Sequence, residues 1–209
     1  RENFRTNYNI YQFLRDYYDD GIDPILPVFK VESNNIAYNG IGLFHEDKLI
    51  EILKPSEARY LSLFREEMTK GTFVEQIDVG EEEKASIMLS YELKDHSIDV
   101  QSNPNNRKKA SIYIELIGDV VEYTGKEDVS DPKIQKKIEK IITKKINQEG
   151  KKLIVKLQKL QVDPLGINRY VRNTMKYNEW KALNKYQAYQ DMNINVEANV
   201  ILNSSGKWK

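Results

Sequence analysis

The chain has 209 residues, with 32 basic and 32 acidic residues and a formal net charge of zero. Hydrophobic residues make up 40% and charged residues 31%, which is typical of a soluble globular protein with a heavily charged surface. The sequence has no cysteine, which excludes disulfides, thiolate nucleophiles and cysteine-based zinc or iron–sulfur sites. No apolar run approaches the roughly 20 residues that a membrane-spanning helix needs.

The N-terminal segment looks like the end of a preceding domain in a longer protein, because it begins at Arg1 without methionine. The spacing of its apolar residues predicts a helix over 6–18, with Thr6 or Asn7 as the N-cap. A glycine and two prolines then predict an extended linker over 23–35.

We therefore assign residues 1–35 to a preceding domain and its linker, and residues 36–209 to a C-terminal domain. "IAYNGIGLF" and "HEDKLIEIL" predict a hairpin with its turn at 45–48, and the two glycines in "NGIG" predict close backbone packing or a bulge. "PSEARYLSLFREEM" predicts a helix with Ser56 as its N-cap.

The middle of the chain predicts an antiparallel meander of three strands, at 71–79, 84–100 and 109–123, because the apolar residues alternate. Asp131-Pro132 opens a long helix over 132–161, whose isoleucines lie on one stripe. A short helix, an irregular or helical piece and a final alternating strand follow. The predicted fold class is α+β: a mostly antiparallel sheet packed with two or more helices, including the long basic one.

The long helix concentrates positive charge, because residues 133–159 contain ten lysines and two glutamates. One interpretation is a solvated face of an amphipathic helix. The other is a surface that contacts lipid headgroups or an acidic partner. Nucleic acid is not expected, because no nucleic-acid-binding module is visible. The candidate basic face consists of Lys136, Lys137, Lys140, Lys144, Lys152 and Lys156.

The sequence predicts no catalytic, cofactor or metal site. The two histidines, His45 and His96, are expected to be exposed, and neither a G-x-S-x-G elbow nor a phosphate-binding loop is present. The acids at 80–84 lack the spacing of a calcium loop and predict a charged turn.

The segment "QVDPLGINRYVRN", residues 161–173, raises a choice between a structural corner and a working site. Asp163 can cap the helix that follows, and the two arginines near its end can point away or clamp a carboxylate. The corner interpretation explains every residue, whereas a catalytic one explains only the acid and the arginines. The residues that form a candidate docking surface or a structural corner are Asp163, Pro164, Leu165, Gly166, Tyr170 and Arg172.

Three blocks in the same order resemble the Ger(x)C family, the C subunits of bacterial spore germinant receptors. These blocks are "NYNIYQFLRDYYDDGIDPILP", "IAYNGIGLFHEDKLIEILKPSEARYLSLFR" and "DPLGINRYVR" with the later strand "INVEANVIL". The resemblance implies a lipoprotein on the outer face of the spore inner membrane, anchored through an N-terminal lipidated cysteine outside this chain. It also implies two membrane subunits as partners and no enzymatic activity.

The predicted function is therefore a non-enzymatic subunit of a nutrient receptor complex that acts in spore germination through protein–protein docking. Two alternatives stay open at this point. One is an outward-facing cell-wall or sugar hydrolase with paired carboxylates, which requires two carboxyl groups roughly 5 to 10 Å apart in a cleft. The other is a soluble domain that senses a small molecule in an apolar pocket with a few polar groups.

Overall fold

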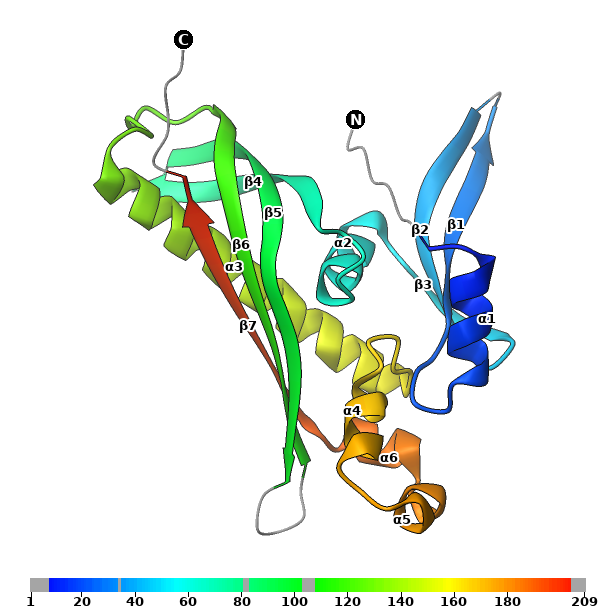
Figure 1. The fold of residues 1–209 in the computed structure, drawn as a ribbon. Coiled ribbons are helices and arrows are strands. Elements are labelled where there is room, and N and C mark those ends of the chain that lie inside the picture. Colours follow the sequence, from blue (N-terminus) through cyan, green and yellow to red (C-terminus); the bar gives the residue numbers. More distant parts are fainter. Residues whose placement is uncertain (1–7, 34, 81–82, 103–107, 204–209) are drawn as a thin grey trace.

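A computed structural model describes residues 8–33, 35–80, 83–102 and 108–203. Figure 1 shows two sheets on either side of helix α2, with the long helix α3 behind the larger sheet. The smaller sheet has three strands and the larger one has four. The predicted α+β class is confirmed, but the sequence pattern predicts one sheet where the structure has two.

The smaller sheet consists of β1 (Ile25–Glu32), β2 (Asn35–His45) and β3 (Lys48–Leu53), all antiparallel. Residues 25–32 are thus a strand and not the extended linker that the prolines indicate. The proposed boundary between residues 35 and 36 falls inside the β1–β2 hairpin, and it stays a prediction. The predicted turn at 45–48 is confirmed.

Helix α1 (Ile10–Tyr18) packs on this sheet, where the rings of Phe13 and Phe44 meet edge to face at 5.5 Å. Its N-cap is Asn9, whose side chain accepts from the backbone N–H groups of the first turn. The prediction of Thr6 or Asn7 is therefore wrong. Asn9 is the N-cap because Gln12 completes a capping box with it.

Gly40, the first glycine of the pair in β2, lies where the backbone packs closely. Its φ is +130°, and a Cβ added there would lie 1.8 Å from the carbonyl oxygen of Leu53. The close backbone packing predicted from "NGIG" is therefore present.

Helix α2 (Pro55–Phe64) follows β3 and is buried along most of its length. Its N-cap is Lys54, whose backbone N–H donates to the Glu57 carboxylate at 3.0 Å. The prediction of Ser56 as N-cap is wrong, since Pro55 already occupies the first helical position.

The larger sheet consists of β4 (Lys70–Gly80), β5 (Glu83–Ser102), β6 (Lys108–Tyr123) and β7 (Asn193–Leu202). The predicted meander of β4, β5 and β6 is confirmed. β7 joins the edge of this meander parallel to β6. A parallel neighbour needs a long crossover, which the intervening helices supply.

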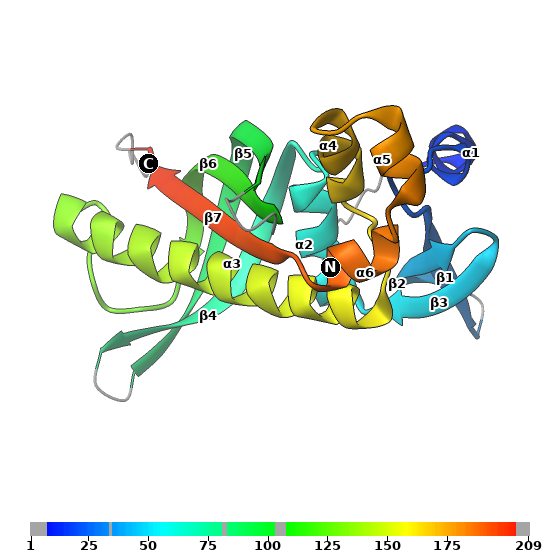
Figure 2. The ribbon, with the colours of Figure 1, turned by 90° about the horizontal axis from the view of Figure 1, so that it is seen from below.

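Helix α3 (Pro132–Leu160) begins with Asp131, whose carboxylate accepts from the N–H of Lys133 at 2.8 Å. Its buried stripe includes Ile138, Ile142 and Ile146. Figure 2 shows α3 running alongside β7. Three side chains spaced four residues apart on α3 accept from the outward N–H groups of β7. The pairs are Asn147 with Ala198 at 2.7 Å, Thr143 with Val200 at 3.2 Å, and Glu139 with Leu202 at 2.8 Å.

Three short helices connect α3 to β7: α4 (Ile167–Asn173), α5 (Tyr177–Ala182) and α6 (Lys185–Gln190). They gather at one end of α3, near α1 (Figures 1 and 2). Within the described ranges, no helix is both long and apolar enough to cross a bilayer.

Candidate functional site: the corner between α1 and α4

Asp163 forms the centre of the corner that joins α3 to α4. Its carboxylate is buried and accepts from the N–H groups of Ile167 at 3.1 Å and Asn168 at 2.7 Å. Asp163 thus accepts from N–H groups in the first turn of α4, although the N-cap residue itself is Gly166. Its own N–H donates to the Asp23 carboxylate at 2.6 Å, and the Asp23 N–H donates back to the Asp163 carbonyl at 3.0 Å. The loop before β1 is thus tied to the corner.

Burial raises the pKa of Asp163 to about 7, although the N–H groups of Asn168 and Ile167 oppose the shift. The nearby Asp23 carboxylate adds to it, and burial also raises the pKa of Asp23. The Nδ1 of His45 lies 3.5 Å from Asp23 Oδ1. Two acids thus share a poorly solvated site that backbone donors stabilise.

The next three residues complete the turn. The Pro164 carbonyl accepts from the Arg65 guanidinium, and Leu165 is buried. Gly166 has a φ of +69°, the left-handed region in which glycine is least strained, and a Cβ there would approach Ile22 to 3.1 Å.

Asp16, near the end of α1, is the third buried acid of the corner. Its side chain is 0% exposed and accepts from the Tyr8 hydroxyl at 2.7 Å. Three arginines surround it, with nitrogens 2.8 Å (Arg65), 2.9 Å (Arg15) and 3.0 Å (Arg169) from its oxygens. Burial alone would raise the pKa of Asp16, but the Tyr8 hydrogen bond and the Arg65 charge outweigh it, so this pKa is lowered.

Arg172 clamps the loop between α1 and β1. Its Nη1 lies 2.9 Å from Asp19 and 2.6 Å from Asp20, and Arg169 Nε lies 2.8 Å from Asp19. The Trp180 indole N–H also donates to Asp20 at 2.9 Å. The arginines of the predicted site therefore clamp carboxylates, but these belong to the α1–β1 loop and not to Asp163.

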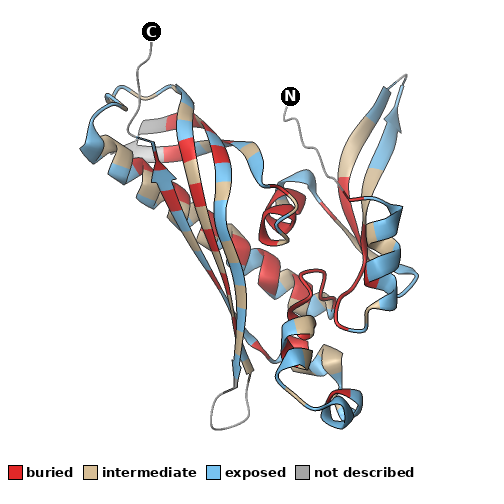
Figure 3. Ribbon diagram, viewed as in Figure 1, coloured by how far each residue is buried: buried red, intermediate tan, exposed pale blue. Residues whose placement is uncertain are grey.

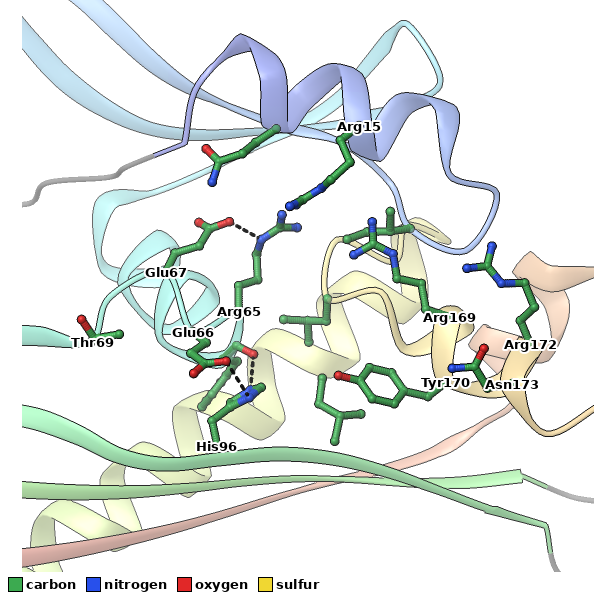
Figure 4. Close-up of a pocket in the computed structure, with 15 residues that line it drawn as sticks. Arg15, Arg65, Glu66, Glu67, Thr69, His96, Arg169, Tyr170, Arg172 and Asn173 are labelled. Carbon is green, nitrogen blue, oxygen red and sulfur yellow. Dashed lines mark hydrogen bonds and ion pairs between the residues drawn. The ribbon is translucent and has the colours of Figure 1, made fainter.

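A pocket of about 710 Å³ opens between α1, the end of α2, β5 and α4. Figure 4 shows Tyr170 reaching into it from α4, while Arg15 enters from α1 and Arg65 from the end of α2. Arg15, Arg65, Arg169 and Arg172 line this pocket, and each is within 3.0 Å of a carboxylate of Asp16, Asp19 or Asp20. Each of these arginines is therefore paired with a carboxylate from within the fold, and an anionic ligand is not required to explain them.

His96 lies at the floor of the pocket, and the prediction that it is exposed is wrong. Its side chain is 9% exposed, and Nε2 lies 2.8 Å from the Phe64 carbonyl oxygen. The burial follows from its place in the middle of β5, which packs near α2. The His45 side chain is more open, at 36%, but the residue is only half-buried rather than exposed, because its ring packs edge to face on Tyr186.

The predicted basic face divides into two groups. Three of its lysines pair within the protein: Lys137 with Glu127 at 3.6 Å, Lys152 with Glu149 at 2.8 Å, and Lys156 with Glu57 at 3.0 Å. The others are exposed and have no ion-pair partner among the described residues. We call these three, Lys136, Lys140 and Lys144, the open lysine row.

The structure groups no three histidine, aspartate or glutamate side chains in a metal-binding arrangement in the ranges that it describes. The side chains of the acidic turn predicted at 80–84 lie outside the part of the chain that the structure describes. The sequence pattern does not single out Asp16, Arg65 or the Asp19–Asp20 pair. The signal that could have found the acids is "RDYYDDGID", whose four aspartates complement the basic "INRYVR" of α4.

These features define an α+β domain of two sheets, fastened at one corner by a buried ion cluster and a capped turn. The chain belongs to the family described as "Spore germination B3/GerAC like, C-terminal", whose sequence model matches residues 39–206.

Two curated proteins are similar over nearly the whole chain. The spore germination protein GerQC of Bacillus cereus is 24% identical over 198 residues, which cover 95% of this chain and 54% of GerQC. The protein YfkR of Bacillus subtilis (strain 168) is 22% identical over 209 residues, which cover 93% of this chain and 52% of YfkR. The chain thus spans about half the length of the curated relatives that it matches.

The fold is similar to that of the GerBC protein, whose crystal structure superposes with a TM-score of 0.67. The superposition covers 89% of this chain and 58% of GerBC, at 18% sequence identity. The resemblance noted in the sequence therefore extends to the three-dimensional fold.

Proposed function

We propose that this chain is part of a non-enzymatic subunit of a nutrient receptor complex and acts in spore germination by docking to partner subunits. The observation that carries the proposal is the family match over residues 39–206. In this proposal the full-length protein is lipid-anchored on the outer face of the spore inner membrane, and its partners are the other receptor subunits.

The chemistry of the corner supports a binding role rather than catalysis. Asp163 accepts two backbone N–H groups, and His96 is bonded to a backbone carbonyl. Asp163 and His96 thus hold the main chain in place. A general acid or base instead needs hydrogen-bond access to a substrate.

The proposed docking surface is the mouth of the corner pocket, centred on Tyr170. This side chain comes from α4, and the residue is 38% exposed. Tyrosine offers a large, rigid contact area and a hydroxyl group, and it is enriched among the residues that dominate binding energy at interfaces. Asn173 and Arg15 line the same pocket and supply polar groups around it.

The test replaces Tyr170 by alanine in the full-length protein and measures co-purification of the other receptor subunits from spores. We expect Tyr170→Ala to keep the thermal melt of the parent protein and to lose most of the co-purifying subunits. Tyr177→Ala is the matched control, since Tyr177 is an exposed tyrosine on α5 and does not line the pocket. Normal assembly of Tyr170→Ala would contradict the proposed docking surface.

A second variant separates docking from folding. Arg172 clamps Asp19 and Asp20, so Arg172→Ala is expected to lower the melting temperature as well as assembly. A loss of assembly with an unchanged melt for Arg172→Ala would instead place Arg172 in the partner contact.

A further inference from the structure

The β1–β2 hairpin extends beyond the rest of its sheet as an arm, which we define as residues 29–33 and 35–38. β3 pairs with β2 only between Ile41 and His45, so the arm has two strands where the base of the sheet has three. An isolated two-stranded hairpin is marginally stable in water. The arm is therefore less supported than the three-stranded base of the sheet.

One face of the arm is apolar. Phe29 pairs with Tyr38 and Val31 pairs with Ile36 across the two strands, so all four side chains lie on the same face. The exposed fractions are 57% for Phe29, 80% for Val31 and 75% for Ile36. The opposite face is polar and carries an ion pair between Lys30 and Glu32 at 2.6 Å.

The apolar face continues the buried side of the sheet. The register shifts between Val28 and Phe29, where Asn39 is an extra residue on β2. Because the extra residue is on β2, side chains along β1 still alternate, and Phe29 and Val31 lie on the same side as Ile25, which is fully buried opposite Leu43. Figure 3 shows burial decreasing from the base of the hairpin to its tip. Helix α1 packs through Phe13 on Phe44, which belongs to the other side of the sheet. Among the residues that the structure describes, the core face is thus extended but left uncovered at the arm.

We infer that the apolar face of the arm is covered by the other half of the full-length protein. The curated relatives match this chain over only 54% and 52% of their own length, and the family model that matches is that of a C-terminal part. About as much chain again therefore belongs to such a protein. A face that extends a folded core, without charged side chains, fits an intramolecular interface between domains. This inference does not depend on the proposed function.

The test measures thiol accessibility in the purified full-length protein at low concentration. Val31→Cys places a thiol on the apolar face, and Lys30→Cys places a matched thiol on the polar face one residue away. We expect the Val31→Cys thiol to react with a maleimide about tenfold or more slowly than the Lys30→Cys thiol, because a covered site reacts only during local opening. Ile36→Cys provides a second probe of the same face if Val31→Cys lowers the thermal melt.

Equal labelling rates at the two positions would overturn the inference. So would protection that increases with protein concentration, since it would indicate a second copy. Protection that arises only when the other receptor subunits are added would overturn it as well, because the face would then belong to a partner.

Discussion

Asp16 and Asp163 are both buried on the two sides of one corner, but they differ in what surrounds the carboxylate. Asp16 is held by three arginines and a tyrosine hydroxyl, and its pKa is lowered. Asp163 is held by backbone N–H groups, and burial raises its pKa to about 7. Neighbouring full charges can offset the desolvation of a carboxylate, whereas the partial charges of two amides offset it only in part.

Removing Asp16 is expected to have the largest effect on stability. Asp16→Ala leaves the buried Arg65 without one of its carboxylate partners, and breaking a buried ion pair in this way costs about 3–5 kcal/mol. Urea unfolding monitored by tryptophan fluorescence measures the change. Asp19→Ala is the control, because its carboxylate is partly exposed and should cost less. An equal loss of unfolding free energy in the two variants would show that the stabilisation does not depend on the burial of the Asp16 carboxylate.

Removing Asp163 should have a smaller effect, because no ion pair is broken. Asp163→Ala leaves the N–H groups of Ile167 and Asn168 without their acceptor, and loss of an N-cap costs about 0.5–2 kcal/mol. The same unfolding experiment measures it. A loss as large as that of Asp16→Ala would contradict the distinction between the two sites.

The pH dependence of stability should separate the two acids by sign. The raised pKa of Asp163 means that the folded state binds the proton more tightly, so this contribution to stability falls as pH rises from about 4 towards 7. The lowered pKa of Asp16 contributes stability above its unfolded pKa of 3.8, and this is lost as pH falls below that value.

The free energy of unfolding, measured between pH 3 and 8, checks this. Asp163→Asn should flatten the slope between about pH 4 and 7, and Asp16→Asn should flatten the loss at the acid end. If Asp163→Asn leaves the wild-type slope between pH 4 and 7 unchanged, the slope would be assigned to Asp23, because burial also raises the pKa of Asp23.

The contact between α3 and β7 offers an uncharged comparison. Asn147→Ala removes the acceptor of the Ala198 N–H and should cost about 1 kcal/mol, the net value of one such hydrogen bond. This loss should be independent of pH between 4 and 8, unlike that at the corner. Gln148→Ala, at the next position on α3, is the control, because the Gln148 side chain is exposed.

The smallest effect on folding is expected from the open lysine row. Exposed substitutions usually change stability by about 0.5 kcal/mol or less. Lys140→Glu combined with Lys144→Glu should therefore leave the melt nearly unchanged. If this row contacts an acidic partner or lipid headgroups, the variant should lose binding to subunits or to anionic vesicles. Unchanged binding to both would leave the row as a solvated face.

The sequence predicts those parts of the structure that local chemistry determines. Asp163 before Pro164 predicts a capped corner, and the alternating apolar residues predict the meander of β4, β5 and β6. The buried ion cluster is not predictable in this way. Asp16 and Arg169 lie at opposite ends of the sequence, and no periodicity connects them. The division into two sheets depends on which strands pair with one another. The alternation of apolar residues within each strand does not specify this pairing.

The hydrogen bonds from α3 to β7 have a consequence for self-association. A sheet edge with unpaired N–H groups is a template on which another chain can add a strand. On β7 the N–H groups of Ala198, Val200 and Leu202 are already bonded to the side chains of Asn147, Thr143 and Glu139. The C-terminal half of this edge is therefore closed to strand addition. Growth of the sheet, whether in assembly or in aggregation, is directed away from this half and towards the opposite edge at β4.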